Sequence, residues 1–402
     1  MDLRFPPSEP LAEPAADLRR VRRLRQRRRL RIRRIGLLVV VAVLAPVLYS
    51  YTATMLKPSS LPLGVRSVEW LRAHRAAWLV NDTERIYYSW TAPKPGGPAL
   101  RTLPSVGKVA PLHVAAPARA YRPARVSPLM APKLAGEGVW RATGSSVGGA
   151  PPVLMTTFRS DPAYPRLVAY VAWLDHTRTQ LGLYPGRYEP PSSLPRGPLE
   201  VPSGERWRLL ATFNSGFTYR DGHGGFALNG RVYEPLVPGM GTVVAYKSGR
   251  VDVVAWHGGR SPGPGVVLAR QNLPLIVDGG RPNPSLSDGP SWGATLGNAI
   301  RVWRSGLGID RRGNLIYAAA DYQTVGSLAA ILIHAGAVRA LELDINAEWP
   351  SFITYGRGGG RDPAKLVPNT QQSATRYLVP DDRDFFALYR RVPAGAKAVP
   401  FR

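Results

Sequence analysis

Residues 324 to 349 read TVGSLAAILIHAGAVRALELDINAEW, and this stretch predicts a helix that leads directly into a strand. From Thr324 to Gly336 the apolar residues recur at helical spacing, and a glycine is a common residue at the end of a helix. From Ala340 to Asn346 apolar and polar residues alternate, which is the pattern of a strand. A helix and a strand joined so closely favour a mixed α+β domain.

The residues before this stretch predict strand after strand. Seven apolar runs are separated by turn-forming residues: 152–160, 166–175, 209–217, 241–256, 265–280, 299–310 and 314–321. Lys247 to Arg250 and Arg311 to Asn314 have the composition of tight turns. With 41 Gly and 40 Pro, the chain favours turns and short strands over long helices. We therefore expect an α+β fold, dominated by sheet and poor in helices.

The N-terminus has the pattern of a membrane anchor. Twelve arginines lie within residues 1–34, and the 22 residues from Ile35 to Leu56 contain no charge. At about 1.5 Å per residue this segment is long enough to cross a hydrocarbon core of about 30 Å. The arginines predict a cytoplasmic N-terminus and a C-terminal domain outside the membrane. A cleaved signal peptide remains an alternative, although no convincing cleavage site follows Leu56.

The segment from residue 57 to 132 is expected to connect this helix to the main domain. Ser67 to Val80 has the spacing of an amphipathic helix, which would rest on the membrane surface or pack on the domain. Glu84 to Trp90 predicts a strand. From Pro93 to Pro132 the chain is rich in Pro, Ala and Arg, as in an extended linker, so we place the main domain at residues 133–395.

The charge and the absence of cysteine limit the possible functions. The net charge is +26, and the surface should attract anionic polymers or lipid headgroups rather than nucleic acid outside a cell. The lack of cysteine excludes disulfides, thiol catalysis and thiolate metal sites. No group of His, Asp and Glu has the spacing of a strong metal site, so we expect neither a metal nor a cofactor.

Asp344 and Glu348, two carboxylates near the end of the strand at Ala340 to Asn346, are the strongest catalytic candidates. Glu342, Asp344 and Asn346 lie on one face of that strand, and Glu348 and Trp349 follow closely. Glycosyl transfer uses one carboxyl to protonate the leaving group and another to attack or to stabilise the cationic centre. The alternative is structural, with Asp344 in a turn and Glu348 in solvent.

Three further stretches have the composition of binding loops. Asn214 to Phe217 ends an apolar strand in small residues, which leave room for a ligand, and Phe217 and Tyr219 could stack on a sugar. Asp221 to Gly225 is a glycine-rich loop that includes His223. Arg304 comes before Ser-Gly-Leu-Gly, where a guanidinium suits phosphate. Each also has a purely structural interpretation, and His257 and His334 are expected to be structural.

Four of these motifs, in order, resemble the phosphodiester glycosidase family. They are Asn214 to Thr218, Gln271 to Gly280, Arg304 to Gly308 and Ala340 to Asp344, and the resemblance extends over about residues 138 to 390. It implies a hydrolase that cleaves the sugar side of a glycosyl-1-phosphodiester in a cell-envelope glycan or glycolipid. Asp344 and Glu348 would then be catalytic, and substrate contacts would come from Asn214, Ser215, Gly216, Phe217, His223, Arg304 and Trp349.

The chain departs from the family pattern at one important place. After Asp344 the family continues Gly-Gly-Gly-Ser, whereas this chain has Ile345 to Trp349, and Ser215 replaces a glycine of the first motif. The changed loop would serve a different substrate or mark the loss of catalysis. The alternative function is therefore a membrane-anchored domain that binds anionic glycans without cleaving them. A structural partner of envelope-synthesis machinery is a third possibility.

Overall fold

The computed structural model describes residues 14–74, 76, 78, 80, 82, 86, 90–106, 121–143, 146–293, 301–357, 360–367 and 372–392. The chain divides into two compact units. The first consists of Met1–Pro58 and Pro62–Arg75, and the second of Ser59–Leu61 and Ala76–Arg402.

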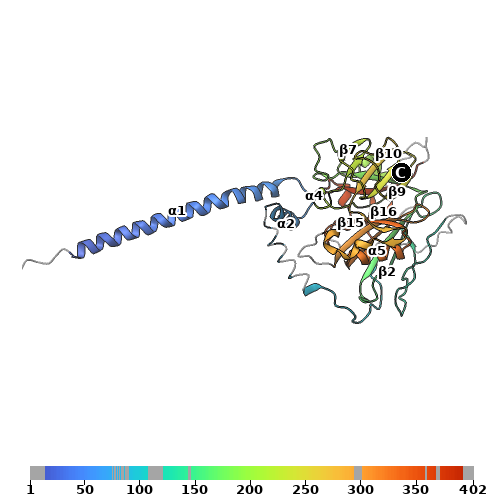
Figure 1. Cartoon of the computed structure of the whole chain (residues 1–402), viewed down its shortest axis with the longest axis horizontal. Coiled ribbons are helices and arrows are strands. Elements are labelled where there is room, and N and C mark those ends of the chain that lie inside the picture. The colour runs from blue at the N-terminus through green and yellow to red at the C-terminus, as the bar shows by residue number, and fades with distance from the viewer. Residues whose placement is uncertain are drawn as a thin grey trace, which may run out of the picture. The chain divides into compact units, whose positions relative to one another are not determined.

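The first unit consists of two helices, α1 (Pro14–Leu56) and α2 (Leu63–Ala73) (Figure 1). By length and composition, Arg22–Leu56 is long and apolar enough to cross a membrane. Helix α2 packs on the end of α1, where the rings of Tyr51 and Trp70 contact each other edge to face with their centroids 5.2 Å apart. It begins and ends earlier than the predicted helix. The strand predicted over residues 84–90 is wrong at Ile86 and Trp90, which have helical backbone in the second unit; the rest of that segment lies outside the described residues.

The second unit is built from three antiparallel sheets, which confirms the predicted sheet-rich α+β class. The largest has eight strands in the order β1-β2-β3-β14-β13-β15-β11-β12. Their bounds are β1 Arg141–Ala142, β2 Val153–Arg159, β3 Val168–Leu174, β14 Leu315–Gln323, β13 Val302–Ile309, β15 Arg339–Ile345, β11 Leu275–Asp278 and β12 Arg281–Pro282.

The other two sheets have five strands each. The β5 sheet has the order β17-β16-β5-β18-β4, with bounds β17 Arg361–Lys365, β16 Phe352–Arg357, β5 Leu209–Asn214, β18 Phe385–Arg390 and β4 Thr179–Tyr184. The β10 sheet has the order β7-β6-β10-β8-β9, with bounds β7 Arg231–Glu234, β6 Phe226–Leu228, β10 Val266–Gln271, β8 Gly241–Tyr246 and β9 Val251–Ala255. The short helices are η1 Ser203–Arg208, α4 Tyr219–Gly222, η2 Pro284–Ser287, η3 Gly289–Trp292 and η5 Arg376–Leu378.

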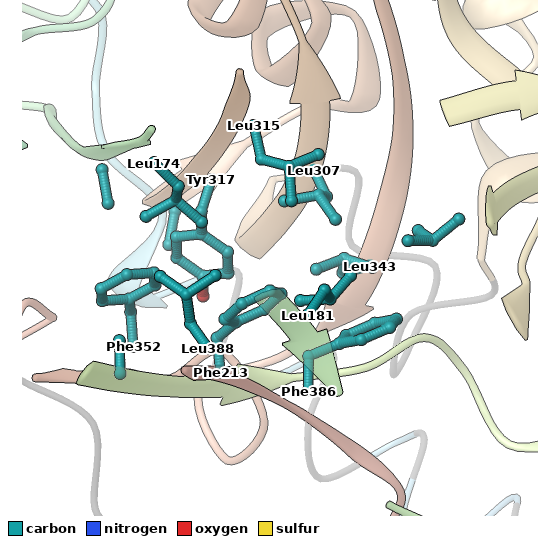
Figure 2. Packing of buried hydrophobic residues seen from close by; sticks show 14 of the residues in the cluster. Leu174, Leu181, Phe213, Leu307, Leu315, Tyr317, Leu343, Phe352, Phe386 and Leu388 are labelled. Carbon is teal, nitrogen blue, oxygen red and sulfur yellow. The ribbon is translucent and has the colours of Figure 1, made fainter. Parts of the chain in front are cut away.

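The main core lies between the eight-stranded sheet and the β5 sheet. Figure 2 shows phenylalanines and leucines of the β5 sheet facing side chains of the larger sheet; the labelled residues are Phe213, Phe352, Phe386, Leu181 and Leu388 opposite Leu174, Leu307, Leu315, Tyr317 and Leu343. Phe213 is completely buried and stacks on Phe386 at 5.2 Å. Burying such a side chain contributes roughly 1.5 to 3 kcal/mol, so this layer fixes how the two sheets face each other.

Helix α5 (Val325–His334) confirms the helix predicted from Thr324 to Gly336, and it covers the other face of the eight-stranded sheet. Thr324 caps its N-terminus, with its hydroxyl accepting from the backbone N–H of Ser327. Gly336 follows its end with a φ of 103°, a conformation that favours glycine. Strand β15 then begins at Arg339, so the short connection fixes where Asp344 lies.

Both predicted hairpin turns are present. Lys247 to Arg250 joins β8 to β9, and Arg311 to Asn314 joins β13 to β14. The segment from Val168 to Gly186 forms two successive strands, but they do not pair with each other. Strand β3 lies in the eight-stranded sheet and β4 at the edge of the β5 sheet. This separation is decided by long-range packing, which the local pattern does not contain.

The residues before β2 are held on the domain by a buried ion pair. Arg159 and Glu137 meet at 2.9 Å, and the side chains of both are fully buried. Arg159 also donates to the carbonyl oxygens of Met130 and Pro132. Part of the stretch predicted as linker is thus tied to the sheet. The boundary at residue 133 stays a prediction.

Candidate active site

Three strand ends bring the sequence motifs together. The carboxyl end of β5 carries Asn214, which pairs with Phe385 at the start of β18. Beyond β5, the carbonyl oxygen of Ser215 accepts from the backbone N–H of Asp344 at 3.0 Å. Arg304 pairs with Ile345 across β13 and β15. The first, third and fourth motifs of the sequence therefore meet at one edge of the fold.

Asp344 is a buried carboxyl with a shifted pKa. Its side chain is 10% exposed, and Oδ2 lies 2.5 Å from Nη2 of Arg383, while Oδ1 accepts from the backbone N–H of Ile345. Burial raises the pKa of Asp344 to about 7, although the nearby Arg383 charge acts to lower it. A carboxyl with such a pKa can hold or release a proton near neutral pH, as a general acid must.

Arg383 is the main residue of this site that the sequence did not indicate. Besides Asp344, it donates to the carbonyl oxygen of Gly216 at 3.3 Å, and its guanidinium lies over the ring of Trp349, 4.4 Å from the centroid. It follows Asp381 and Asp382 in a run of charged residues just before an apolar strand, and such a run is typical of an exposed surface. The one available signal in the sequence was its position two residues before the apolar run that begins at Phe385.

Glu348 and Trp349 lie on the loop after β15, close to a second arginine. Trp349 is 7% exposed. The guanidinium of Arg383 lies 4.4 Å from the centroid of its ring, and that of Arg376 lies 5.7 Å from it. Burial raises the pKa of Glu348, while Arg376 lowers it. Oε2 of Glu348 is buried and has no hydrogen-bond partner among the described residues. Arg376 also acts on Asp344, so both candidate carboxylates border one cationic, aromatic cluster.

Asn214 holds the strand ends in place through its amide. Its Oδ1 accepts from the hydroxyl of Tyr317 and the backbone N–H of Ser351, both at 2.9 Å. Its Nδ2 donates to Oγ of Ser305 at 3.0 Å, and that hydroxyl donates to the carbonyl oxygen of Asp344 at 2.7 Å. The amide is therefore occupied with the protein itself and positions Asp344. Its predicted role of orienting a sugar stays a prediction.

The small residues after Asn214 have different environments. Oγ of Ser215 is buried and has no partner among the described residues. A Cβ on Gly216 would lie 3.0 Å from Cγ of Asn272, so a side chain here would fit only if Asn272 shifted. Phe217 is 4% exposed and packs with Val302 and Ile345. Its ring belongs to the core, so the expectation that it stacks on a sugar has no support in this geometry.

Arg304 is 1% exposed and bound on several sides. Its Nη1 lies 2.6 Å from Oε1 of Glu342, and it donates to the carbonyl oxygens of Gln323 and Trp292. Burial raises the pKa of Glu342 to about 7, with Arg304 acting to lower it. Arg304 thus stabilises the strands behind Asp344. Its predicted contact with phosphate stays a prediction, and Arg383 is the more exposed guanidinium at Asp344.

The glycine-rich loop 221–225 is partly buried: its glycines are buried, whereas Asp221 and His223 are exposed. His223 is exposed, follows α4 with a φ of 49°, and contacts the Tyr219 ring at 5.7 Å. The negative charge of Asp221 contributes to raising the pKa of Asp344. His334, predicted to be structural, lies 2.7 Å from the carbonyl oxygen of Ser127.

Glu189 is a further carboxyl that sequence reasoning missed. Its Oε2 accepts from the backbone N–H of Tyr219 at 3.1 Å. Burial raises its pKa, and Arg383 and Arg270 act to lower it. Arg270 is paired with Asp384 at 2.7 Å. Glu189 lies in a Pro-rich stretch with no strand pattern, so its place beside Arg383 is a result of the tertiary fold.

The described residues contain no group of three or more His, Cys, Asp or Glu that could hold a metal ion. The side chains around Asp344 supply carboxyl, guanidinium and hydroxyl groups. The arrangement combines a carboxyl that titrates near neutral pH with two arginines at its border. Such a site can transfer a proton to or from a bound anion.

Comparison with known proteins shows distant structural similarity only. No protein-family model matches the chain, and no curated protein matches it. The catalytic domain of zebrafish N-acetylglucosamine-1-phosphodiester alpha-N-acetylglucosaminidase, auto-inhibited by its pro-peptide, has a TM-score of 0.42 and 15% identity, with 63% of this chain and 88% of that chain covered.

Two other solved structures are still less similar. A hypothetical protein from Synechocystis has a TM-score of 0.38 and 14% identity, covering 62% of this chain and 65% of that one. An exported protein from Burkholderia pseudomallei has a TM-score of 0.35 and 13% identity, covering 57% and 75%. The similarity to all three structures is therefore distant.

Proposed function

We propose that this protein is a membrane-anchored hydrolase that cleaves the sugar side of a glycosyl-1-phosphodiester, with Asp344 as its acid. One observation carries the proposal: a buried carboxyl whose pKa is raised to about 7 contacts an arginine at the point where the sequence motifs converge. The order of those motifs, which resembles phosphodiester glycosidases, supports the reaction class. The apolar segment within Arg22–Leu56 supports anchoring, with the C-terminal domain outside the membrane.

In this proposal the proton on Asp344 passes to the phosphate oxygen that leaves the sugar. The bond between the anomeric carbon and that oxygen breaks, water supplies the new hydroxyl of the sugar, and the proton that the water releases restores the protonated Asp344. The positive charge of Arg383 attracts the phosphodiester. Glu348 is the second carboxyl, which stabilises or attacks the cationic sugar. Trp349 packs on Arg383 and fixes the direction of its guanidinium.

The test is release of free sugar from a panel of sugar-1-phosphodiesters by the full chain in detergent. Asp344→Asn keeps the size of the side chain and removes its proton chemistry, so turnover should fall by roughly a hundredfold or more. Asp278→Asn, at the exposed end of β11, is the matched control and should retain turnover. Equal turnover by Asp344→Asn and the parent protein would refute the assignment.

The second candidate is a binding domain without catalysis. It is favoured by the loop after Asp344, which has Ile345 to Trp349 where the family pattern has glycines. Such a protein would bind anionic glycans with an affinity that falls as salt rises, and would release no sugar. The same panel separates the two, because binding without any product supports the second candidate alone.

A further inference from the structure

Two hollows with basic linings adjoin along strand β4, and neither contains a residue of the Asp344 site. The first has a volume of about 520 Å³ and is lined by Arg196, Arg208 and Arg231, among others. The second has a volume of about 650 Å³, and its basic residues are Arg178, Lys247 and Arg391. Gln180 of β4 lines both. We call the two together the β4 groove.

The positive charge of the β4 groove is only partly neutralised. No Asp or Glu lines either hollow, although Arg208 is paired with Glu205 and Arg178 with Asp175 nearby. Three other cations donate to backbone carbonyl oxygens: Arg196 to Gly186, Arg231 to Pro195 and Arg391 to Gly249. Within the described part of the chain, neither these three arginines nor Lys247 forms an ion pair. A concave surface with such unbalanced charge concentrates anions.

A simpler explanation of the basic residues is that they protect an exposed strand edge. The positions of these residues in the chain argue against that explanation. Strand β4 is at the edge of its sheet, where basic side chains commonly prevent pairing with another chain. That purpose needs charges on β4 itself. Here Arg231 comes from β7, Lys247 from the turn between β8 and β9, and Arg196 from the segment before η1. Convergence of separate segments is typical of a binding site.

The aromatic side chains of the groove indicate which anions fit. Proteins that bind single-stranded nucleic acid stack its bases on exposed rings. Here Tyr233 is 7% exposed and Tyr389 is 3% exposed, and the guanidinium of Arg208 covers the Tyr389 ring at 4.3 Å from its centroid. Tyr184 also lines the groove and is half-buried, and one face of its ring stacks on Phe385 at 5.1 Å. The groove therefore offers guanidinium and ammonium groups rather than ring faces. These groups match phosphate oxygens.

We propose that the β4 groove binds a glycan or polyol polymer with repeating phosphate groups. Two adjoining hollows suit a polymer better than one small anion, because successive phosphates can occupy them together. The inference rests on the proposed function in one respect: a chain held in the β4 groove would present one of its sugar phosphodiesters to the Asp344 site. Binding itself requires no catalysis.

The test is binding of fluorescent poly(glycerol phosphate) to the full chain in nanodiscs of uncharged lipid. The variant Arg196→Gln, Arg231→Gln, Lys247→Gln should bind about tenfold more weakly, with a smaller dependence on salt. The control variant Arg260→Gln, Arg281→Gln, Arg311→Gln loses the same charge from exposed positions outside the groove and should bind like the parent. Lys247→Gln alone changes an exposed side chain and should weaken binding in the same direction even if the triple variant fails to fold.

Equal weakening in both triple variants would overturn the proposal, because net charge would then explain binding. Tighter binding of oligothymidylate than of the polymer would also overturn it, in favour of nucleic acid. Asp344→Asn should bind the polymer normally, which separates this inference from catalysis. If sugar is released from no substrate, the proposed reaction fails while the binding result still decides the role of the groove.

Discussion

Nη2 of Arg383 lies 2.5 Å from Oδ2 of Asp344, and the same nitrogen donates to the carbonyl oxygen of Gly216. Arg383 lies just before β18, and its side chain connects the end of β15 to the turn after β5. Its guanidinium is held in turn by the ring of Trp349. This contact places a positive charge against the carboxyl that we assign as the acid, and the first prediction follows from it.

The pH dependence of turnover should follow Asp344. Burial raises its pKa to about 7, so the protonated form that a general acid needs is lost as the pH rises through that value. Arg383 acts to lower this pKa, so Arg383→Gln should move the decline in kcat/KM to higher pH. Arg281→Gln, at an exposed and distant position, should leave the profile unchanged. A profile in Arg383→Gln that stays in place or moves to lower pH contradicts the assignment.

Stability should depend on the same carboxyl, with a definite sign. An unfolded Asp has a pKa of about 3.9, and the folded value is about 7, so between them only the folded state binds the proton. The free energy of unfolding therefore falls as pH rises from about 4 to about 7. Asp344→Asn does not titrate, and its stability relative to the parent should increase over this range, by on the order of 1 to 4 kcal/mol. Urea unfolding at pH 4 and pH 8 measures this, and a difference that does not change with pH counts against it.

The second carboxyl can be identified by substitution. Burial raises the pKa of both Glu348 and Glu189, and each has an arginine of the site nearby. If Glu348 is the partner of Asp344, Glu348→Gln should reduce kcat by roughly a hundredfold. Glu189→Gln should then affect KM more than kcat. The reverse result would assign the role to Glu189, and steady-state kinetics on one substrate distinguishes the two.

Gly216 should tolerate no side chain. A Cβ there would lie 3.0 Å from Cγ of Asn272, whose Oδ1 accepts from Phe217 and whose Nδ2 donates to Glu342. Gly216→Ala should therefore cost about 1 to 3 kcal/mol of stability and reduce turnover as well. Gly259→Ala, where nothing lies within 4 Å of the added carbon, is the control and should be nearly neutral. Thermal unfolding that is identical for the two variants would show that the site adjusts.

The buried pair of Arg159 and Glu137 should be important for stability. Both side chains are fully buried, so Glu137→Gln leaves an uncompensated guanidinium in the core. The expected loss is about 3 to 5 kcal/mol. The pair of Arg206 and Glu200 is more exposed and 3.6 Å long, and Glu200→Gln should cost at most about 1 kcal/mol. Urea unfolding measures the loss of unfolding free energy in Glu137→Gln and in Glu200→Gln. Similar losses in the two variants would contradict the burial of the Arg159 and Glu137 pair.

Much of the fold could be predicted because its elements have strong local patterns. The alternating residues of β8 and β9 and the turn at Lys247 to Arg250 specify a hairpin without reference to the rest of the chain. Helix α5 has its periodicity, its cap at Thr324 and its terminal Gly336 within one segment. Local patterns failed where long-range packing decided the outcome, as for β3 and β4, which are close in sequence but lie in different sheets.

The sequence by itself determined the apolar N-terminal helix, the sheet-rich class and the importance of the stretch around Asp344, because hydrophobic periodicity and turn residues act over a few neighbours. Only the tertiary structure decided what surrounds that carboxyl. Arg383 and Ser215 are both far from Asp344 in the chain and contact it only in the folded domain. The pKa of Asp344 depends on this burial and on that charge. Neither is a property of local sequence, since both arise from contacts between strands that are distant in the chain.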